Sequence, residues 1–155
     1  MPGLWLDEMF EGQVFDHPIR RTITEADNVL FCAMTMNPAA IHLDHAYAAG
    51  TEFRKPIVNS LLTLGLMIGI SVHDTTLGTT VANLGMEDVT FPAPVFHGDT
   101  IRVRTTVRSV RPSKSRPGQG VVTFRHEAFV VKQAGQADVL VAGCKRAALM
   151  LARKP

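Results

Sequence analysis

Hydrophobic and polar positions alternate most regularly between Asp99 and Val110. The alternation sets four positions on one side and four on the other: Ile101, Val103, Thr105 and Val107 against Arg102, Arg104, Thr106 and Arg108. This period of two predicts a half-exposed antiparallel strand. Three more strands are predicted, over 79–91 with an irregularity at Gly85, and over 120–132 and 138–151 with a turn at 133–136 between them. The pattern predicts strands in sequence order, as a meander.

The amino-terminal part of the chain predicts a strand followed by a helix. Residues 13–23 read as a first strand, which Pro18 weakens because proline cannot donate to a sheet ladder. Thr24 is a candidate N-cap, with Asp27 three positions later, for a helix through about Met34.

A break and a second short helix come next. Pro38 disfavours helical backbone at Asn37, so residues 35–41 are predicted to interrupt the helical segment. Residues 44–49 suit a short helix before the chain breaks again at Pro56.

Residues 56–73 contain no formally charged side chain. The stretch also contains polar residues, and its unbroken apolar core is too short for a membrane span of about 20 residues. We therefore expect a buried core helix from about Asn59 to Ser71, because a helix that is apolar on all faces is a buried one. One such helix and one antiparallel sheet predict an α+β architecture, with the sheet wrapped round the helix.

Composition narrows the class of protein. The chain has 155 residues, the size of one domain, and is 46% hydrophobic and 19% charged, a globular balance. A net charge of +2 gives no electrostatic case for nucleic acid. Cys32 and Cys144 have no metal-finger spacing, and the acidic start does not resemble a secretory signal. We expect a cytoplasmic protein with reduced cysteines that is not in a membrane.

His42 is the first candidate for chemistry. Imidazole is the natural acid or base near neutral pH, and an irregular loop can direct it at a pocket. A surface or capping histidine is the alternative. A metal site from His42, Asp44 and His45 is weaker, since a fourth ligand is lacking. Asn37 can hold a water but cannot take its proton, and asparagine before proline is also a common turn residue.

Two further segments can bind a ligand. Asn59 and Ser60 begin the predicted core helix, whose first N–H groups are free donors at the positive end of the dipole. Such a donor can stabilise an enolate oxygen, or the pair can simply cap the helix. Arg111, Lys114 and Arg116 form a basic loop that can hold nucleotide phosphates, or can be a solvated hairpin.

Three segments carry a resemblance to a known family: NPAAIHLDHAYA, FRKPIVNSLLTLG and FPAPVFHGDTIRV. Together with the order of elements they resemble the MaoC-like (R)-specific enoyl-CoA hydratase family, over roughly residues 12–149. The resemblance implies a single hot-dog domain, an acyl-CoA thioester substrate, no cofactor and no metal. It also implies a homodimer, or a multiple of dimers, with active sites at or near the interface.

The resemblance also implies roles for particular residues. His42 falls on the catalytic histidine of the family, and Asn37 falls on its catalytic aspartate. Ser60 falls on the glycine whose N–H holds the thioester oxygen, beside Asn59. Asp44 matches the downstream part of the motif and is a candidate substrate contact. The motif resembles that of a subgroup acting on branched dicarboxyl substrates, β-methylmalyl-CoA and mesaconyl-CoA.

Three functions remain open at this stage. In the first, His42 alone moves the proton, Asn37 positions the water and the Ser60 N–H stabilises the enolate, in either direction of a hydration. In the second, the chain only binds acyl-CoA. The third is a thioesterase, which needs a carboxylate near the thioester carbon, for which Asp44 and Glu52 are weak candidates.

Overall fold

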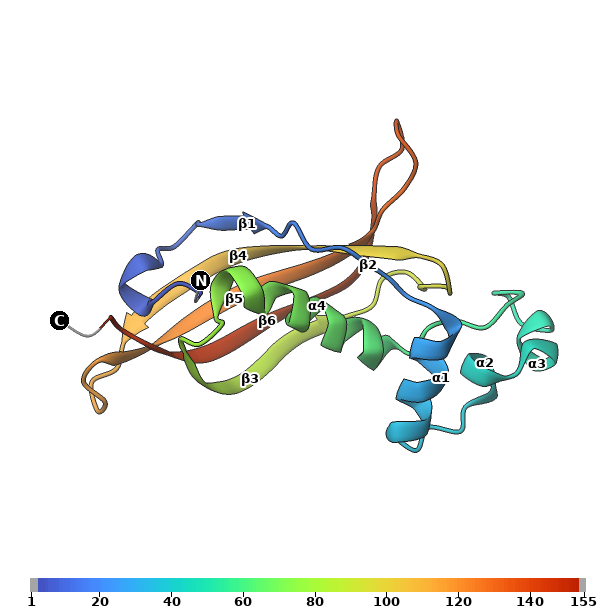
Figure 1. Ribbon diagram of the computed structural model, residues 1–155, viewed down its shortest axis with the longest axis horizontal. Helices are drawn as coiled ribbons and strands as arrows, with labels where there is room; N and C mark the ends of the chain where they lie inside the picture. Colours follow the sequence, from blue (N-terminus) through green and yellow to red (C-terminus); the bar gives the residue numbers. More distant parts are fainter. Residues whose placement is uncertain (1–2, 154–155) are drawn as a thin grey trace.

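The computed structural model describes residues 3–153. One antiparallel sheet carries the order β1-β4-β5-β6-β3, with the short β2 pairing to β4 (Figure 1). The strands are β1 (Val14–Asp16), β2 (Arg21–Thr22), β3 (Thr80–Thr90), β4 (Thr100–Pro112), β5 (Gln119–Val130) and β6 (Val139–Leu151). The helices are η1 (Leu6–Glu8), α1 (Glu25–Met34), α2 (Ala40–Leu43), α3 (His45–Ala49) and α4 (Ser60–Thr75).

The long helix α4 lies along one face of the sheet, while α1, α2 and α3 gather beyond one end of it (Figure 1). Met67 and Ile70 of α4 pack in one buried cluster with Ile101, Val103 and Ala128 of the sheet. The alternation of β4 is confirmed, because Ile101 and Val103 are buried and the intervening Arg102 and Arg104 are not. The expected α+β arrangement of a helix against an antiparallel sheet is confirmed.

The first strand differs from the prediction. Instead of one strand over 13–23, β1 and β2 form two short pieces that both pair with β4. The break follows His17, where Pro18 has no N–H to donate to the ladder. The two pieces remain on the same edge of the sheet.

The predicted meander is wrong for β3. Only β4, β5 and β6 follow one another in the sheet, and β3 pairs with β6 instead of β4. Pro92 and Pro94 lie in the connection between β3 and β4. This connection is not a tight hairpin, because it leads from the β3 edge past β6 and β5 to β4. The irregularity expected at Gly85 is present as a register shift between Asn83 and Gly85.

Helix α4 is longer and less buried than predicted. It starts at Ser60 and continues to Thr75, past the expected end at Ser71. One row of its surface is exposed, formed by Leu61, Gly65, Gly69 and His73 at spacing four. Among the described residues, no helix is long and apolar enough to cross a membrane.

Candidate active site

The ring of His42 is fixed at one nitrogen. His42 lies in the single turn of α2, and its Nδ1 is 2.9 Å from the carbonyl oxygen of Ile57. A carbonyl oxygen only accepts, so Nδ1 carries the proton and donates it. The neutral ring therefore presents Nε2 as an acceptor. A half-buried imidazole held by one hydrogen bond, with the other nitrogen basic, has the arrangement of a general base.

Asn37 forms hydrogen bonds with the backbone on both sides of it. Its Oδ1 accepts the N–H of Ala39 at 3.0 Å, which forms an Asx turn. Its own N–H donates to the carbonyl of Cys32 at 2.9 Å. Met36, just before it, lies beyond the end of α1 and has a φ of 55°. The turn role considered from the sequence is present. The amide Nδ2 is the part of Asn37 left to face a water.

Within residues 3–153, the start of α4 has one backbone N–H without an acceptor, next to one that is capped. The Asn59 side chain accepts the N–H of Leu61 at 3.0 Å, and its carbonyl accepts the N–H of Leu62 and Thr63. The capping interpretation is therefore correct for Asn59, which is buried. This pattern leaves the backbone N–H of Ser60 at the positive end of the α4 dipole.

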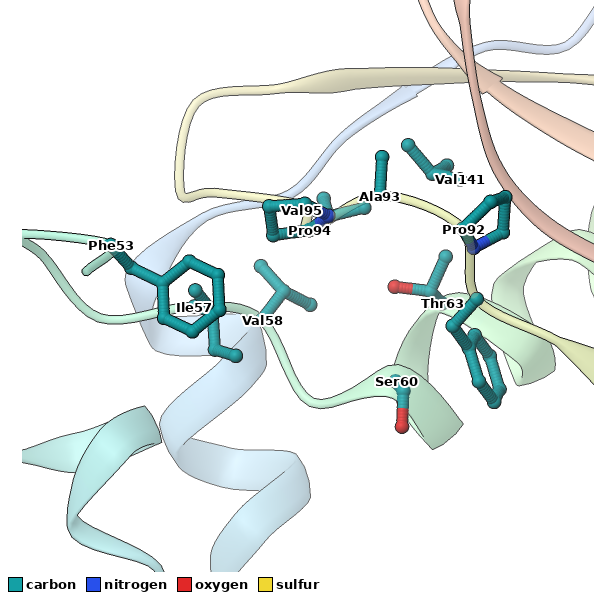
Figure 2. Close-up of a pocket in the computed structure, with 11 residues that line it drawn as sticks. Phe53, Ile57, Val58, Ser60, Thr63, Pro92, Ala93, Pro94, Val95 and Val141 are labelled. Carbon is teal, nitrogen blue, oxygen red and sulfur yellow. The ribbon is translucent and has the colours of Figure 1, made fainter. Parts of the chain in front are cut away.

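A cavity of about 240 Å³ opens at this helix start (Figure 2). It lies between residues 53–58, the first turn of α4 and residues 91–95. Its lining is apolar apart from Ser60 and Thr63, and the hydroxyl of Thr63 points into the space (Figure 2). His42 does not line the cavity, but it bonds to the carbonyl of Ile57, which does.

His42 is connected to Ser60 through Ile57, whose carbonyl bonds to the His42 ring. Ser60 follows Ile57 by three positions, a reach of no more than about 11 Å of extended backbone. The structure therefore brings the candidate base, the free N–H donor and an apolar cavity to one end of the sheet.

The acidic residues near His42 have structural roles. Asp44 is exposed and accepts the N–H of Tyr47 at 2.9 Å, which caps α3. His45 bonds to Glu25 at 2.6 Å, and this hydrogen bond lowers the pKa of the Glu25 carboxyl. The residues weighed as metal ligands thus have separate partners. Glu52 is exposed.

Within one chain, the basic loop lies far from His42. Arg111, Lys114 and Arg116 lie around the β4–β5 hairpin, at the end of the sheet opposite α1, α2 and α3 (Figure 1). Strand β4 runs between these ends from Thr100 to Pro112, about 40 Å at the usual rise per residue.

Two buried polar residues of this region were not predicted. Thr63 is 2% exposed, and its hydroxyl has no hydrogen-bond partner within residues 3–153. Asn28 is fully buried and hydrogen-bonds to the segments carrying His42 and Ser60. The available signal was the spacing of Asn28 and Cys32, four positions apart on a single face of α1.

Residues 8–128 match the model of the MaoC like domain. The chain belongs to the MaoC-like dehydratase family. It is 30% identical over 129 residues to the β-methylmalyl-CoA dehydratase of Chloroflexus aurantiacus, covering 83% of this chain and 36% of that protein. It is 29% identical over 144 residues to an (R)-specific enoyl-CoA hydratase of Rhodospirillum rubrum, covering 88% of this chain and 91% of that one.

Solved MaoC-like structures have the same fold. The MaoC-like dehydratase of Rhodospirillum rubrum superposes with a TM-score of 0.81 at 25% identity, covering 99% of this chain and 100% of that chain. The double hot-dog protein Rv0216 of Mycobacterium tuberculosis gives 0.79 at 25% identity, covering 99% of this chain and 46% of that one. The fold of this MaoC-like chain is the hot-dog fold. The chain spans about a third of the β-methylmalyl-CoA dehydratase that it matches.

Proposed function

We propose that this MaoC-like protein adds water to a 2-enoyl-CoA, or removes it from the corresponding 3-hydroxyacyl-CoA. The observation that carries the proposal is His42, held through Nδ1 by the carbonyl of Ile57, which lies three positions before Ser60, the first residue of α4. Relatives in this family are named enoyl-CoA hydratases and dehydratases.

The proposed chemistry divides between these two groups. During hydration His42 Nε2 takes a proton from the water that attacks C3 and delivers it to C2 of the enolate. During dehydration it removes the C2 proton and gives it to the hydroxyl that leaves C3 as water. The Ser60 N–H, with the α4 dipole, stabilises the negative charge that develops on the thioester oxygen. Asn37 Nδ2 orients the water. The apolar part of the acyl group enters the cavity beside Ser60.

The preferred acyl group is proposed to be a branched dicarboxyl group, as in mesaconyl-CoA and β-methylmalyl-CoA. Relatives bearing those names are about 30% identical to this chain. Asn37 is uncharged, so it does not repel a second substrate carboxylate as an aspartate at that position would.

We propose that the protein works as a dimer built on the β3 edge. Strand β3 is an outer strand, and its Val81, Leu84 and Val89 are exposed large hydrophobic residues. A two-fold axis beside β3 reverses the strand direction in the second copy, so its basic loop reaches the end of the sheet that carries His42. Arg111, Lys114 and Arg116 of that copy are then placed to hold the CoA phosphates.

A substrate screen tests the proposed function. The purified protein is incubated with crotonyl-CoA, mesaconyl-CoA and saturated acyl-CoAs, while enoyl absorbance and free thiol are followed. Loss of enoyl absorbance without thiol release is the expected result. Thiol release alone would identify a thioesterase instead. No change in enoyl absorbance or free thiol, together with tight CoA binding, would identify a protein that only binds acyl-CoA.

A further inference from the structure

The side chain of Asn28 joins four backbone and side-chain groups around the candidate site. Its Oδ1 accepts the N–H of Asn59 at 2.8 Å. Its Nδ2 lies 3.2 Å from the carbonyl oxygen of His42, 3.3 Å from that of Ile57 and 3.2 Å from Nε2 of His97. All four partners lie in segments outside α1.

The partners fix which way the Asn28 amide faces. An N–H can only donate, so the atom facing Asn59 is the oxygen. Two carbonyls can only accept, so the atom facing His42 and Ile57 is the nitrogen. His97 must then accept at Nε2 and carry its proton on Nδ1 in the neutral ring. The amide has two hydrogens for three acceptors, which share them.

These contacts reach both halves of the proposed catalytic arrangement. Asn28 holds the backbone of His42 directly, and it shares the Ile57 carbonyl with the His42 ring. It also holds the N–H of Asn59, the residue immediately before Ser60. One buried side chain therefore connects the base to the start of α4.

We propose that Asn28 is a positioning residue that sets the orientation of His42 Nε2 relative to the Ser60 N–H. This inference rests on the proposed function. Asn28 is fully buried and acts through His42 and Asn59 without touching the substrate. Its loss leaves two carbonyls and one N–H to find new partners, which shifts both catalytic groups, and displacements near 1 Å cost about 100-fold in rate.

The first variant is Asn28→Ala. We expect kcat to fall about 10- to 100-fold with KM within a factor of about three, because the acyl cavity does not include Asn28. The matched control is Asp27→Ala, the adjacent position of α1, which removes the carboxylate that accepts the Thr24 N–H but touches neither His42 nor Asn59. The control should keep the wild-type kcat at a temperature where both variants are folded.

The second variant, Asn28→Asp, is isosteric and covers the case in which Asn28→Ala does not fold. One carboxylate oxygen can still accept from Asn59, but the other faces two carbonyl oxygens, which disfavours its charged form. Only the protonated acid can donate as the amide does. The kcat of N28D relative to wild type should therefore rise as the pH falls from 8 to 5.

A readout independent of turnover is the tautomer of His42, followed by NMR of 15N-labelled histidine. Wild type should show the Nδ1–H form, and the Asn28→Ala protein should show a mixture of tautomers. If the wild type hydrates no enoyl-CoA, the proposed function fails while this spectrum still tests the positioning role. A folded Asn28→Ala protein with unchanged kcat and an unchanged His42 tautomer would overturn the proposal, as would N28D activity with the wild-type pH profile.

Discussion

Asn37 shows how one residue can serve the backbone and the substrate together. The Asx turn uses its Oδ1, and an aspartate at this position could accept the same Ala39 N–H. The Asn37→Asp change should therefore leave the turn intact and supply a second acid/base beside His42. We expect higher kcat/KM on crotonyl-CoA and lower kcat/KM on mesaconyl-CoA, measured by enoyl absorbance.

The control is Asn37→Ala, which removes both the turn acceptor and the water contact and should lower activity on both substrates. Equal changes on the two substrates in N37D would contradict the account of a charged acyl group near this position.

At this scale the sequence singles out candidate residues that have motif positions and misses candidates that are defined by three-dimensional contacts. His42 and Ser60 follow from the motif and from the chemistry of helix starts. Asn28 lies on a helix with no motif of its own, and its four partners come from segments distant in sequence. Spacing along one helix indicates that Asn28 faces inward, but it does not indicate which groups Asn28 hydrogen-bonds to.

At the scale of the elements, strands β4 and β5 contain a buried polar pair. His126 Nδ1 and Thr105 Oγ1 are 2.8 Å apart, and Thr105 is also 2.8 Å from Nε2 of His17. Burial of the ring, followed by the charges of Arg146 and His17, lowers the pKa of His126 from 6.5 to about 3. The folded protein therefore keeps His126 neutral in mildly acidic solution.

This pKa predicts a loss of stability in acid. Above pH 6.5 both folded and unfolded chains hold His126 neutral, so it contributes no pH dependence. Between pH 6.5 and 3 the unfolded chain takes up a proton that the folded chain does not, so His126 lowers the free energy of unfolding by up to about 1.4 kcal/mol per pH unit. Urea unfolding from pH 7 to 5 measures this slope.

In His126→Gln the free energy of unfolding should depend less on pH, by the contribution of about one proton. In the control His73→Gln, on the exposed row of α4, the pH dependence should stay as in wild type. Identical slopes in wild type and His126→Gln would show that His126 does not resist protonation.

Most elements were predicted to within a few residues, because period-two alternation and capping residues are local signals. The end of α4 was not, since Ser71 and Thr75 are polar yet buried, with their hydroxyls bonded to carbonyls of the helix itself. The pairing of β3 with β6 was also missed, because alternation fixes a strand but not its neighbour.

At the scale of the whole molecule, the β3 edge predicts the assembly. We expect a dimer at micromolar concentration by sedimentation velocity. Leu84→Lys should shift it to monomer, because a lysine on an outer strand opposes edge pairing. Val14→Lys is the matched control, an exposed apolar residue on the opposite edge strand, and should leave the dimer intact. A monomeric wild type would refute the assembly.

The basic loop gives a second prediction at this scale. Replacing Lys114 and Arg116 by Ala should raise KM for acyl-CoA with little change in kcat, and the effect should shrink as salt rises. Arg108→Ala, an exposed cation on β4, is the control. Because the loop is proposed to serve the second copy, Leu84→Lys should raise KM in the same way. Unchanged KM of this double variant at low salt would show that the loop is only a solvated hairpin.

We propose His42 as the essential acid/base of this protein. The most direct measurement is kcat of His42→Ala on the best substrate of the wild type. We predict a fall of about 10²- to 10⁴-fold with CoA binding and folding retained. His45→Ala, in the same segment but paired with Glu25 at the surface, should keep kcat. Full activity of His42→Ala on every substrate that the wild type turns over would contradict the account.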